Sequence, residues 1–195
     1  MTAFTTRPEI LGTFGVVTST HWIASSVGMS ILEKGGNAFD AAVATGFVLQ
    51  VLEPHLNGPG GDMPAVIYSK KKDKVEVICA QGPAPAGATI EHYKGEGIEI
   101  IPGDGLLATV IPGAFDGWML MLRDHGTMEL AEVMAPAIKL ADDGHPILDR
   151  AVDTIAGLAD FYTKHWPGSA ALWLPGGKPP EKGSLFRNPQ LAKTW

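Results

Sequence analysis

The sequence predicts a layered α/β fold. Residues 38–52 are apolar on nearly every side of a predicted helix, so this helix must be buried. A glycine-rich loop at residues 53–61 follows it, and residues 64–69 and 75–80 then have the composition of two paired strands. A buried helix that leads through a glycine-rich turn into a sheet is a common way to build a layered α/β core.

Composition indicates the broad class of protein. The chain has 195 residues, 45% of them apolar, which predicts one domain, or one large and one vestigial domain. The net charge of −6 argues against nucleic acid or an anionic membrane as a partner. Cys79 is the single cysteine, which excludes an intrachain disulfide and a cysteine metal cluster.

Neither a leader nor a membrane anchor is predicted. Residues 1–8 lack the apolar core of a signal peptide, and no apolar run approaches the roughly 20 residues that span a bilayer. We therefore expect a cytoplasmic protein with no membrane partner, or a periplasmic one if a signal peptide has been trimmed.

The first elements can be placed from short-range signals. Residues 1–14 form a predicted lead-in, and residues 15–19 have the composition of a short strand. Apolar residues at helical spacing predict a helix over residues 22–34, which Gly35 closes.

The buried helix and the paired strands carry signals of their own. Asn37 suits the N-cap of the helix, and Asp40 faces the positive end of its dipole. The glycines after Pro54 permit close backbone approach or dihedral angles that other residues avoid. The lysine-rich run at residues 70–74 is predicted to be a solvated turn between the strands rather than a binding patch.

Helical patterns return after a loop-rich stretch at residues 81–111. Pro112 suits the start of a helix. Apolar stripes predict helices at residues 115–122 and 130–141, and a third helix is expected at residues 149–165. Residues 15–165 are thus the predicted α/β core.

Residues 166–195 differ in character from this core. They are rich in proline and glycine as far as Gly183, which predicts an irregular excursion over the surface. A helix is predicted after Asn188, but six residues are too few to be stable alone. We therefore expect the start of a truncated helical region, explained by a fragment or by a second polypeptide.

Several sequence motifs, in one order, resemble the amino-terminal half of the γ-glutamyltranspeptidases. The first two are LEKGGNAFDAAVA at residues 32–44 and EPHLNGPGG at residues 53–61. The others are found at residues 84–86, 110–117, 130–141 and 186–194. The resemblance covers residues 12–195, and several motifs in one order are specific where a single glycine cluster would be weak.

This resemblance implies an Ntn-hydrolase αββα four-layer sandwich, of which this chain holds only the N-terminal portion. In such proteins one precursor cuts itself, and a threonine becomes the new terminus of the smaller subunit. The threonine hydroxyl attacks an amide carbonyl, and the oxyanion-hole glycines belong to the smaller subunit as well. The resemblance thus implies no catalytic residue in this chain, no cofactor, and the small subunit of the same precursor as a partner.

By the same resemblance, this chain supplies one wall of the substrate pocket. In the family an arginine shortly before the Ala-Pro pair binds the α-carboxylate of the glutamyl group, and Gln81 occupies that position here. Glutamine offers neutral donors in place of a charged bidentate fork, a loss on the order of 1–3 kcal/mol. The alternative is that Gln81 is an ordinary loop residue and that Arg187, or an arginine outside this chain, binds the carboxylate.

The loop between the buried helix and the first strand is expected to be structural. We assign it no chemistry, and expect His55 to brace it by hydrogen bonding. The residues given this role are Pro54, His55, Gly58, Gly60 and Gly61.

Other chemistries fit the sequence less well. The glycine loop at residues 58–61 lacks a lysine and lies between helix and strand in the reverse order of a P-loop. The histidines have no metal-site spacing, and no GxSxG elbow occurs. Cys79 is predicted to be a buried, inert thiol. Thr2 would become terminal if Met1 were removed, but its lead-in lacks the rigidity that a nucleophile needs.

The sequence therefore predicts the large-subunit portion of an Ntn-type amidohydrolase or acyltransferase that is inactive alone. Its substrate would be a small-molecule amide with a γ-glutamyl, glutaryl or similar acyl group. The alternative is a non-catalytic remnant with a structural or binding role.

Overall fold

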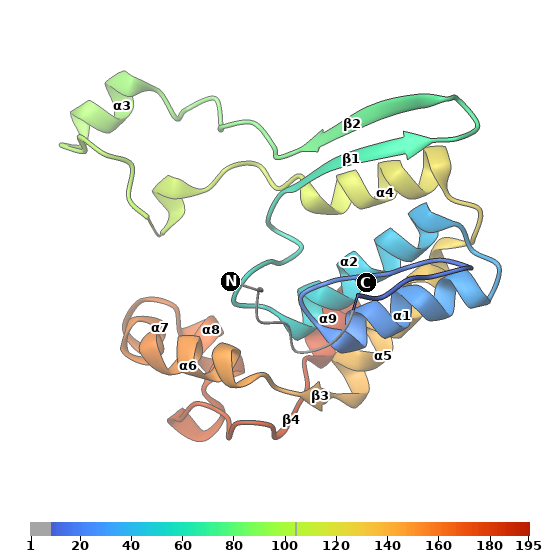
Figure 1. Cartoon of the computed structure of the whole chain (residues 1–195). Coiled ribbons are helices and arrows are strands. Elements are labelled where there is room, and N and C mark those ends of the chain that lie inside the picture. Colours follow the sequence, from blue (N-terminus) through green and yellow to red (C-terminus); the bar gives the residue numbers. More distant parts are fainter. Residues whose placement is uncertain (1–8, 104) are drawn as a thin grey trace, which may run out of the picture.

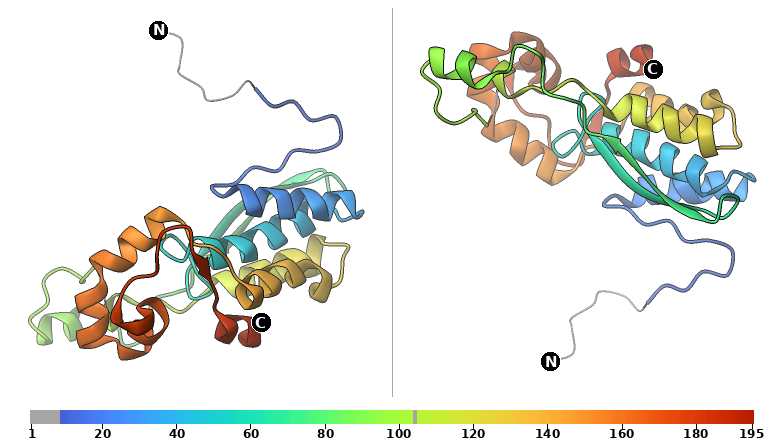
Figure 2. Two further views of the ribbon diagram at one scale, coloured as in Figure 1. Left: turned by 90° about the horizontal axis from the view of Figure 1, so that it is seen from below. Right: turned by 90° about the horizontal axis from the view of Figure 1, so that it is seen from above.

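The computed structural model describes residues 9–103 and 105–195 (Figures 1 and 2). The core helices are α1 (Trp22–Glu33), α2 (Ala38–Leu52), α4 (Ala114–His125) and α5 (Leu130–Asp143). A hairpin consists of β1 (Met63–Ser69) and β2 (Lys74–Ala80). The shorter elements are α3 (Ile90–Gly95), η1 (Leu106–Ala108), β3 (His145–Pro146), α6 (Asp149–Gly157), α7 (Ala159–His165), α8 (Pro167–Trp173), η2 (Pro175–Gly177), β4 (Leu185–Phe186) and α9 (Pro189–Thr194).

Helix α2 is the centre of the helical layer. It packs against α1, α4 and α5, and both strands of the hairpin pack on α4. Figure 1 shows the hairpin on one side of these helices, next to α4. Side chains of α2 such as Val43, Phe47 and Val48 are completely buried. The predicted buried helix and the layered α/β arrangement are both confirmed.

The junction between α1 and α2 also matches the prediction. Gly35 follows the last turn of α1 with a φ of 96°, a left-handed conformation that glycine adopts at little cost. The Asn37 side chain accepts hydrogen bonds from the amides of Phe39 and Asp40, and the Asp40 carboxylate accepts one from the Asn37 amide. This reciprocal capping box fixes the direction in which α2 starts.

The Asp40 carboxylate also joins α2 to the turn between α4 and α5. It is fully buried and accepts hydrogen bonds from the Asn37 amide at 2.8 Å, the Thr127 hydroxyl at 2.7 Å, and the Thr127 and Met128 amides at 2.9 and 3.2 Å. Burial by itself raises the pKa of this carboxyl. The hydrogen bonds from Thr127, Asn37 and Met128 together outweigh burial and hold the pKa below its ordinary value.

The hairpin follows the predicted strands and turn. Its strands are antiparallel, with Met63 opposite Ala80 and Ser69 opposite Lys74, and the lysine-rich turn between them is exposed. Alternate side chains point to opposite faces, so Ile78 is buried while Val77 is 69% exposed. Cys79 lies on the exposed face, so the prediction of a buried thiol was wrong. The register of β2, rather than the apolar character of the strand, decides its exposure.

The predicted strand at residues 15–19 was also wrong. From Gly15 to Thr20 the side chains alternate between half-buried and exposed, as they would in a strand, but no strand is assigned there. A strand requires a neighbouring chain for its ladder of hydrogen bonds. The described residues place no paired strand beside this segment.

The loop-rich stretch predicted after the hairpin is confirmed. Its described parts, residues 81–103 and 105–111, project from the end of the hairpin in Figure 1 and are called the arm below. The arm contains only the short elements α3 and η1, neither of which has a buried residue. The Tyr93 hydroxyl ties them together by donating a hydrogen bond to the Leu107 carbonyl at 2.8 Å.

The C-terminal part departs from the prediction in two places. The helix expected over residues 149–165 is divided into α6 and α7 at Leu158, directly after Gly157, a poor helix former. The stretch expected to be irregular contains α8 and η2, and Leu174, which lies between them, packs with Ile155 and Phe186 in a second hydrophobic cluster. This cluster explains why a segment rich in glycine and proline still forms helical turns.

Helix α9 begins where it was predicted to begin. The Asn188 side chain caps it by accepting a hydrogen bond from the Leu191 amide at 3.1 Å. The helix packs on α5, and the Trp195 ring contacts Phe47 edge-on at a centroid distance of 5.3 Å. Within the described residues, no helix has both the length and the apolar character needed to cross a lipid bilayer.

His145, in β3, is a buried histidine close to the end of α5. Its side chain is 2% exposed, and neither ring nitrogen has a hydrogen-bond partner among the described residues. Burial lowers the pKa of His145, the nearby Leu140 carbonyl acts in the opposite direction, and the His21 ring lowers the pKa further. Burial in the folded state therefore favours the neutral form of this imidazole.

Replacing Asp40 is expected to destabilise the fold. In Asp40→Asn the side-chain NH2 group takes the place of one carboxylate oxygen, so it faces groups that themselves donate hydrogen bonds. The negative charge that strengthens these hydrogen bonds is lost as well. We expect the free energy of unfolding to fall by about 2–4 kcal/mol. Urea denaturation at pH 7 measures this loss, and the exposed Asp62→Asn serves as the control. A loss in Asp40→Asn no larger than in the control would contradict this account.

His145 is expected to make the fold sensitive to mild acid. Its pKa is lower in the folded than in the unfolded state, so its contribution to stability is present above about pH 6.5, the ordinary histidine value, and is lost as the pH falls towards the folded pKa. One such group gives a slope of at most about 1.4 kcal/mol per pH unit. Urea denaturation at several pH values between 7 and 5 should show a shallower slope in His145→Leu than in the parent. Equal slopes would refute the prediction.

Candidate functional site

Two segments that carry sequence motifs, and a third that directly precedes one, meet at one place through their backbones. The amides of Gly113 and Ala114 donate hydrogen bonds to the Gly61 carbonyl at 3.2 and 3.0 Å. The Ile111 amide donates to the Pro83 carbonyl at 3.0 Å. The loop after α2, the end of β2 and the start of α4 therefore form one structure, which we call the backbone crossing.

Two glycines make the backbone crossing possible. A Cβ atom at Gly82, where φ is 75°, would overlap the Ile111 carbonyl oxygen. A Cβ atom at Gly113 would overlap the Ala80 carbonyl oxygen. Only glycine permits backbones to approach so closely. Gly113 belongs to the motif at residues 110–117, and Gly82 lies just before the motif at residues 84–86. The role of each glycine depends on a partner about 30 positions away, so local pattern did not reveal it.

Gln81 is held between these contacts. It stands next to Gly82, its side chain is exposed, and its Oε1 atom lies 3.6 Å from the Sγ atom of Cys79. A substrate group that reached this edge of the crossing would meet a neutral amide and a thiol. Gln81 thus lies between two closely packed backbone positions, Ala80 and Gly82, and its side chain is accessible.

The loop at residues 53–61 is braced mainly by its own backbone. The Glu53 carbonyl accepts hydrogen bonds from the amides of Leu56 and Asn57 at 2.9 and 3.2 Å, and Gly61 N donates to Gly58 O at 3.0 Å. Pro54 is half-buried. The buried Nδ1 atom of His55 has no hydrogen-bond partner in the described part of the chain. The backbone turns hold the loop without this atom, and the role of His55 in bracing it stays a prediction.

The start of this loop is also anchored to the beginning of α1. Glu53 is buried, and its carboxylate accepts a hydrogen bond from the Thr20 hydroxyl. Burial lowers the pKa of the neighbouring His21, and the Glu53 charge partly offsets this effect. Glu53 therefore holds the N-terminal segment against the C-terminal end of α2.

The alternative residues lie elsewhere. Arg187 is exposed after β4, and its side chain lies near Gly144, away from the contacts that define the backbone crossing. Thr2 lies outside the described residues. Within the parts of the chain that the structure describes, no three His, Cys, Asp or Glu side chains are grouped so that they could hold a metal ion.

Comparisons with known proteins agree on one family. The profile of the gamma-glutamyltranspeptidase family matches residues 24–195. A glutathione hydrolase-like proenzyme of Bacillus subtilis is 35% identical, with 94% of this chain and 35% of that protein covered. An oxamate amidohydrolase proenzyme of Klebsiella pneumoniae is also 35% identical, with 94% of this chain and 35% of that protein covered. An acylase ACY 1 proenzyme of a Pseudomonas species is 38% identical, with 88% of this chain and 32% of that protein covered.

Solved structures show the same relationship. A structure of LmbA2991 matches 99% of this chain and 33% of its own with a TM-score of 0.95 and 53% identity. Cephalosporin acylase from Bacillus halodurans matches with a TM-score of 0.90 and 30% identity, over 100% of this chain and 37% of its own. Helicobacter pylori gamma-glutamyltranspeptidase matches with a TM-score of 0.87 and 34% identity, over 96% of this chain and 54% of its own.

This chain spans about a third of the length of the curated relatives that it matches. Its helices and hairpin superimpose on the N-terminal portion of the Ntn-hydrolase sandwich that the longer structures contain. Because the family profile covers most of the chain and the solved relatives share its fold, the chain belongs to the γ-glutamyltranspeptidase family.

Proposed function

We propose that this chain acts as the large-subunit part of an Ntn-type amidohydrolase or acyltransferase whose nucleophile is a threonine of the small subunit. The observation that supports this most directly is the backbone crossing, which joins the family motifs at residues 53–61 and 110–117 to the segment just before a third, and leaves Gln81 accessible at its edge. The names of the relatives include glutathione hydrolase, oxamate amidohydrolase and acylase, which all cleave amides.

The reaction follows from the nucleophile that we propose. The threonine hydroxyl forms an ester bond with the acyl carbon while the amide C–N bond breaks, and the hydroxyl proton leaves with the amine by way of the terminal amino group. Water then cleaves the ester to give the carboxylic acid, or a second amine takes the acyl group. This chain contributes a wall of the pocket: the groups at the backbone crossing are main chain and neutral side chains, which can shape and hold an acyl group.

The proposal gives Gln81 a role in the choice of acyl group. A neutral amide side chain can donate and accept single hydrogen bonds but cannot form the charged, bidentate pair that arginine forms with a carboxylate. We therefore propose that acyl groups with a distal carboxylate, such as γ-glutamyl, are bound less tightly here than in an enzyme with arginine at this position.

Expression of the full-length gene tests the proposed function. We expect two polypeptides, the second beginning with threonine, and cleavage of γ-glutamyl, glutaryl or simple amides by the pair. Electrophoresis, N-terminal sequencing and an amide hydrolysis assay measure these outcomes. A single 20.6 kDa species without activity on all three substrate classes would instead support the non-catalytic remnant.

Gln81→Arg in the two-subunit enzyme tests the binding role. The arginine should raise kcat/KM for γ-glutamyl-p-nitroanilide by about tenfold or more, relative to the carboxylate-free pentanoyl-p-nitroanilide, because a hydrogen-bonded charge pair is gained. Gln81→Lys, which adds charge without the planar fork, should give a smaller gain. An unchanged substrate ratio in Gln81→Arg would show that Gln81 does not face the substrate carboxylate.

A further inference from the structure

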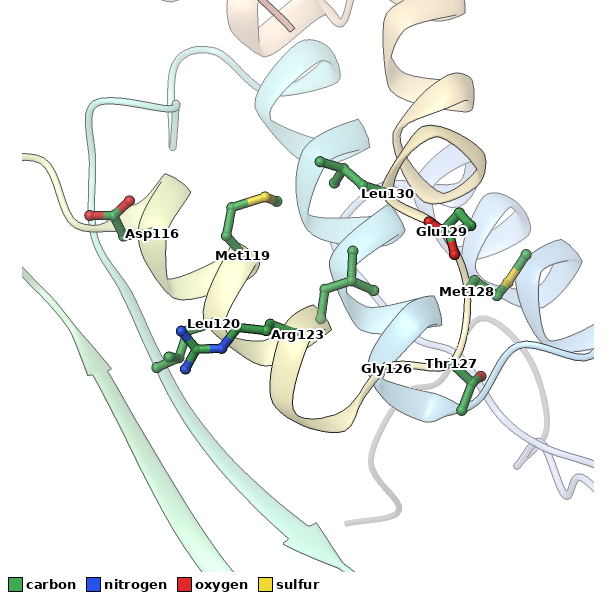
Figure 3. A pocket seen from close by; sticks show the side chains of 10 residues that line it. Asp116, Met119, Leu120, Arg123, Gly126, Thr127, Met128, Glu129 and Leu130 are labelled. Carbon is green, nitrogen blue, oxygen red and sulfur yellow. The ribbon is translucent and has the colours of Figure 1, made fainter.

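A groove runs along α4 and α5, on surfaces that the backbone crossing does not use. One part, of about 750 Å³, lies between α4 and the start of α5 (Figure 3). A second part, of about 760 Å³, follows the outer side of α5 to Trp195. The two parts share Glu129 and Leu130, so we treat them as one surface, the α4–α5 groove.

The floor of this groove is apolar and incompletely covered. Leu120 is 39% exposed and Leu130 is 40% exposed. The other apolar side chains that line it are Met119, Leu122, Met128, Ala131, Met134, Ala135, Ile138 and Trp195. On α5 the apolar side chains recur at residues 130, 134 and 138, which is the spacing of one helical ridge. Residues 116, 119, 120 and 123 of α4 line the opposite wall of the groove. Two ridges with an apolar valley between them fit a third helix.

The rim of the groove carries an excess of negative charge. Arg123 pairs with Asp124, and Lys139 pairs with Asp143, so both cations of the rim are already engaged. The carboxylates of Asp116, Glu129 and Asp142 form no ion pair with any described residue. All three are exposed, and they lie on both walls of the groove. An occupant with lysine or arginine beside its apolar stripe would complement them.

Helix α9 indicates which polypeptide can reach this place. It packs on α5, its Leu191 and Ala192 pack against the hydrophobic core, and Trp195 lines the groove itself. A chain that continues from Trp195 therefore starts inside the groove. The curated relatives are about three times as long as this chain, so such proteins contain ample polypeptide to fill it.

We propose that the α4–α5 groove is the docking surface for an amphipathic helix formed by the residues that follow Trp195 in the full-length proenzyme, with a basic flank directed at Asp116, Glu129 and Asp142. This rests on the proposed assignment to a longer proenzyme, but not on its activity. The helix covers the apolar valley, and its cations neutralise the acidic rim. The large-subunit core is thereby completed by its own chain and not by the small subunit.

Thiol labelling compares the groove in the 195-residue chain and in the full-length proenzyme. In a Cys79→Ser background, Ala131→Cys places a thiol in the groove, and Glu132→Cys places one on the same exposed turn of α5 outside it. Maleimide should react with both at similar rates in the 195-residue chain. In the proenzyme, Ala131→Cys should react at least about tenfold more slowly than Glu132→Cys, since labelling requires the groove to open.

A charge series tests the basic flank. Asp116→Asn, Glu129→Gln and Asp142→Asn together should remove much of the protection of Ala131→Cys in the proenzyme. Neutralising the exposed Glu91, Glu96 and Glu99 of the arm, which changes the net charge equally, should leave it intact. No effect of the groove triple variant, or an equal effect of the control, would overturn the basic flank.

Two results would overturn the docking proposal as a whole. The first is equal protection, or equal exposure, of the two thiols in the proenzyme. The second is protection of Ala131→Cys in the 195-residue chain that grows with protein concentration, which would identify a second copy as the occupant. Because labelling does not depend on amide cleavage, failure here and failure of the proposed activity are distinguishable.

Discussion

The buried Asp40 carboxylate is the interaction on which the arrangement of the core depends. It accepts hydrogen bonds from the first turn of α2 and from the turn at residues 127–128, so one charge sets the position of α2 relative to both α4 and α5. An unpaired anion at this depth would be costly, and donors on every side remove that cost. Once the start of α2 is fixed, its other end delivers Glu53 and the following glycine loop to the backbone crossing.

The backbone crossing extends this fixed arrangement to the candidate site. Its contacts run from main chain to main chain, through Gly61, Gly113 and Ile111, so they do not depend on the identity of neighbouring side chains. A change of the accessible side chain at its edge, Gln81, would therefore leave these main-chain contacts in place.

Sequence reasoning succeeded where the determining forces are local. The Asn37 cap, Asp40 in the first turn and the all-round apolar pattern of α2 involve neighbouring positions, and the structure has all three. It failed where a distant partner decides. Residues 15–20 have the alternation of a strand but no ladder, Cys79 is exposed by its register, and the need for Gly82 and Gly113 comes from contacts across about 30 positions. The α4–α5 groove likewise exists only once two helices are packed.

The outer face of the hairpin extends this argument to the whole fold. An antiparallel sheet with one solvated face normally places polar residues there. Here the outward residues include Val66, Tyr68, Val75 and Val77, which are 76, 56, 60 and 69% exposed. The inner face of the hairpin already packs on α4. Apolar side chains on the outer face as well are typical of a pair of strands that is buried on both sides. In a four-layer sandwich a second sheet packs on that face, so the hairpin carries the composition of an inner layer although the helices here cover only one of its sides.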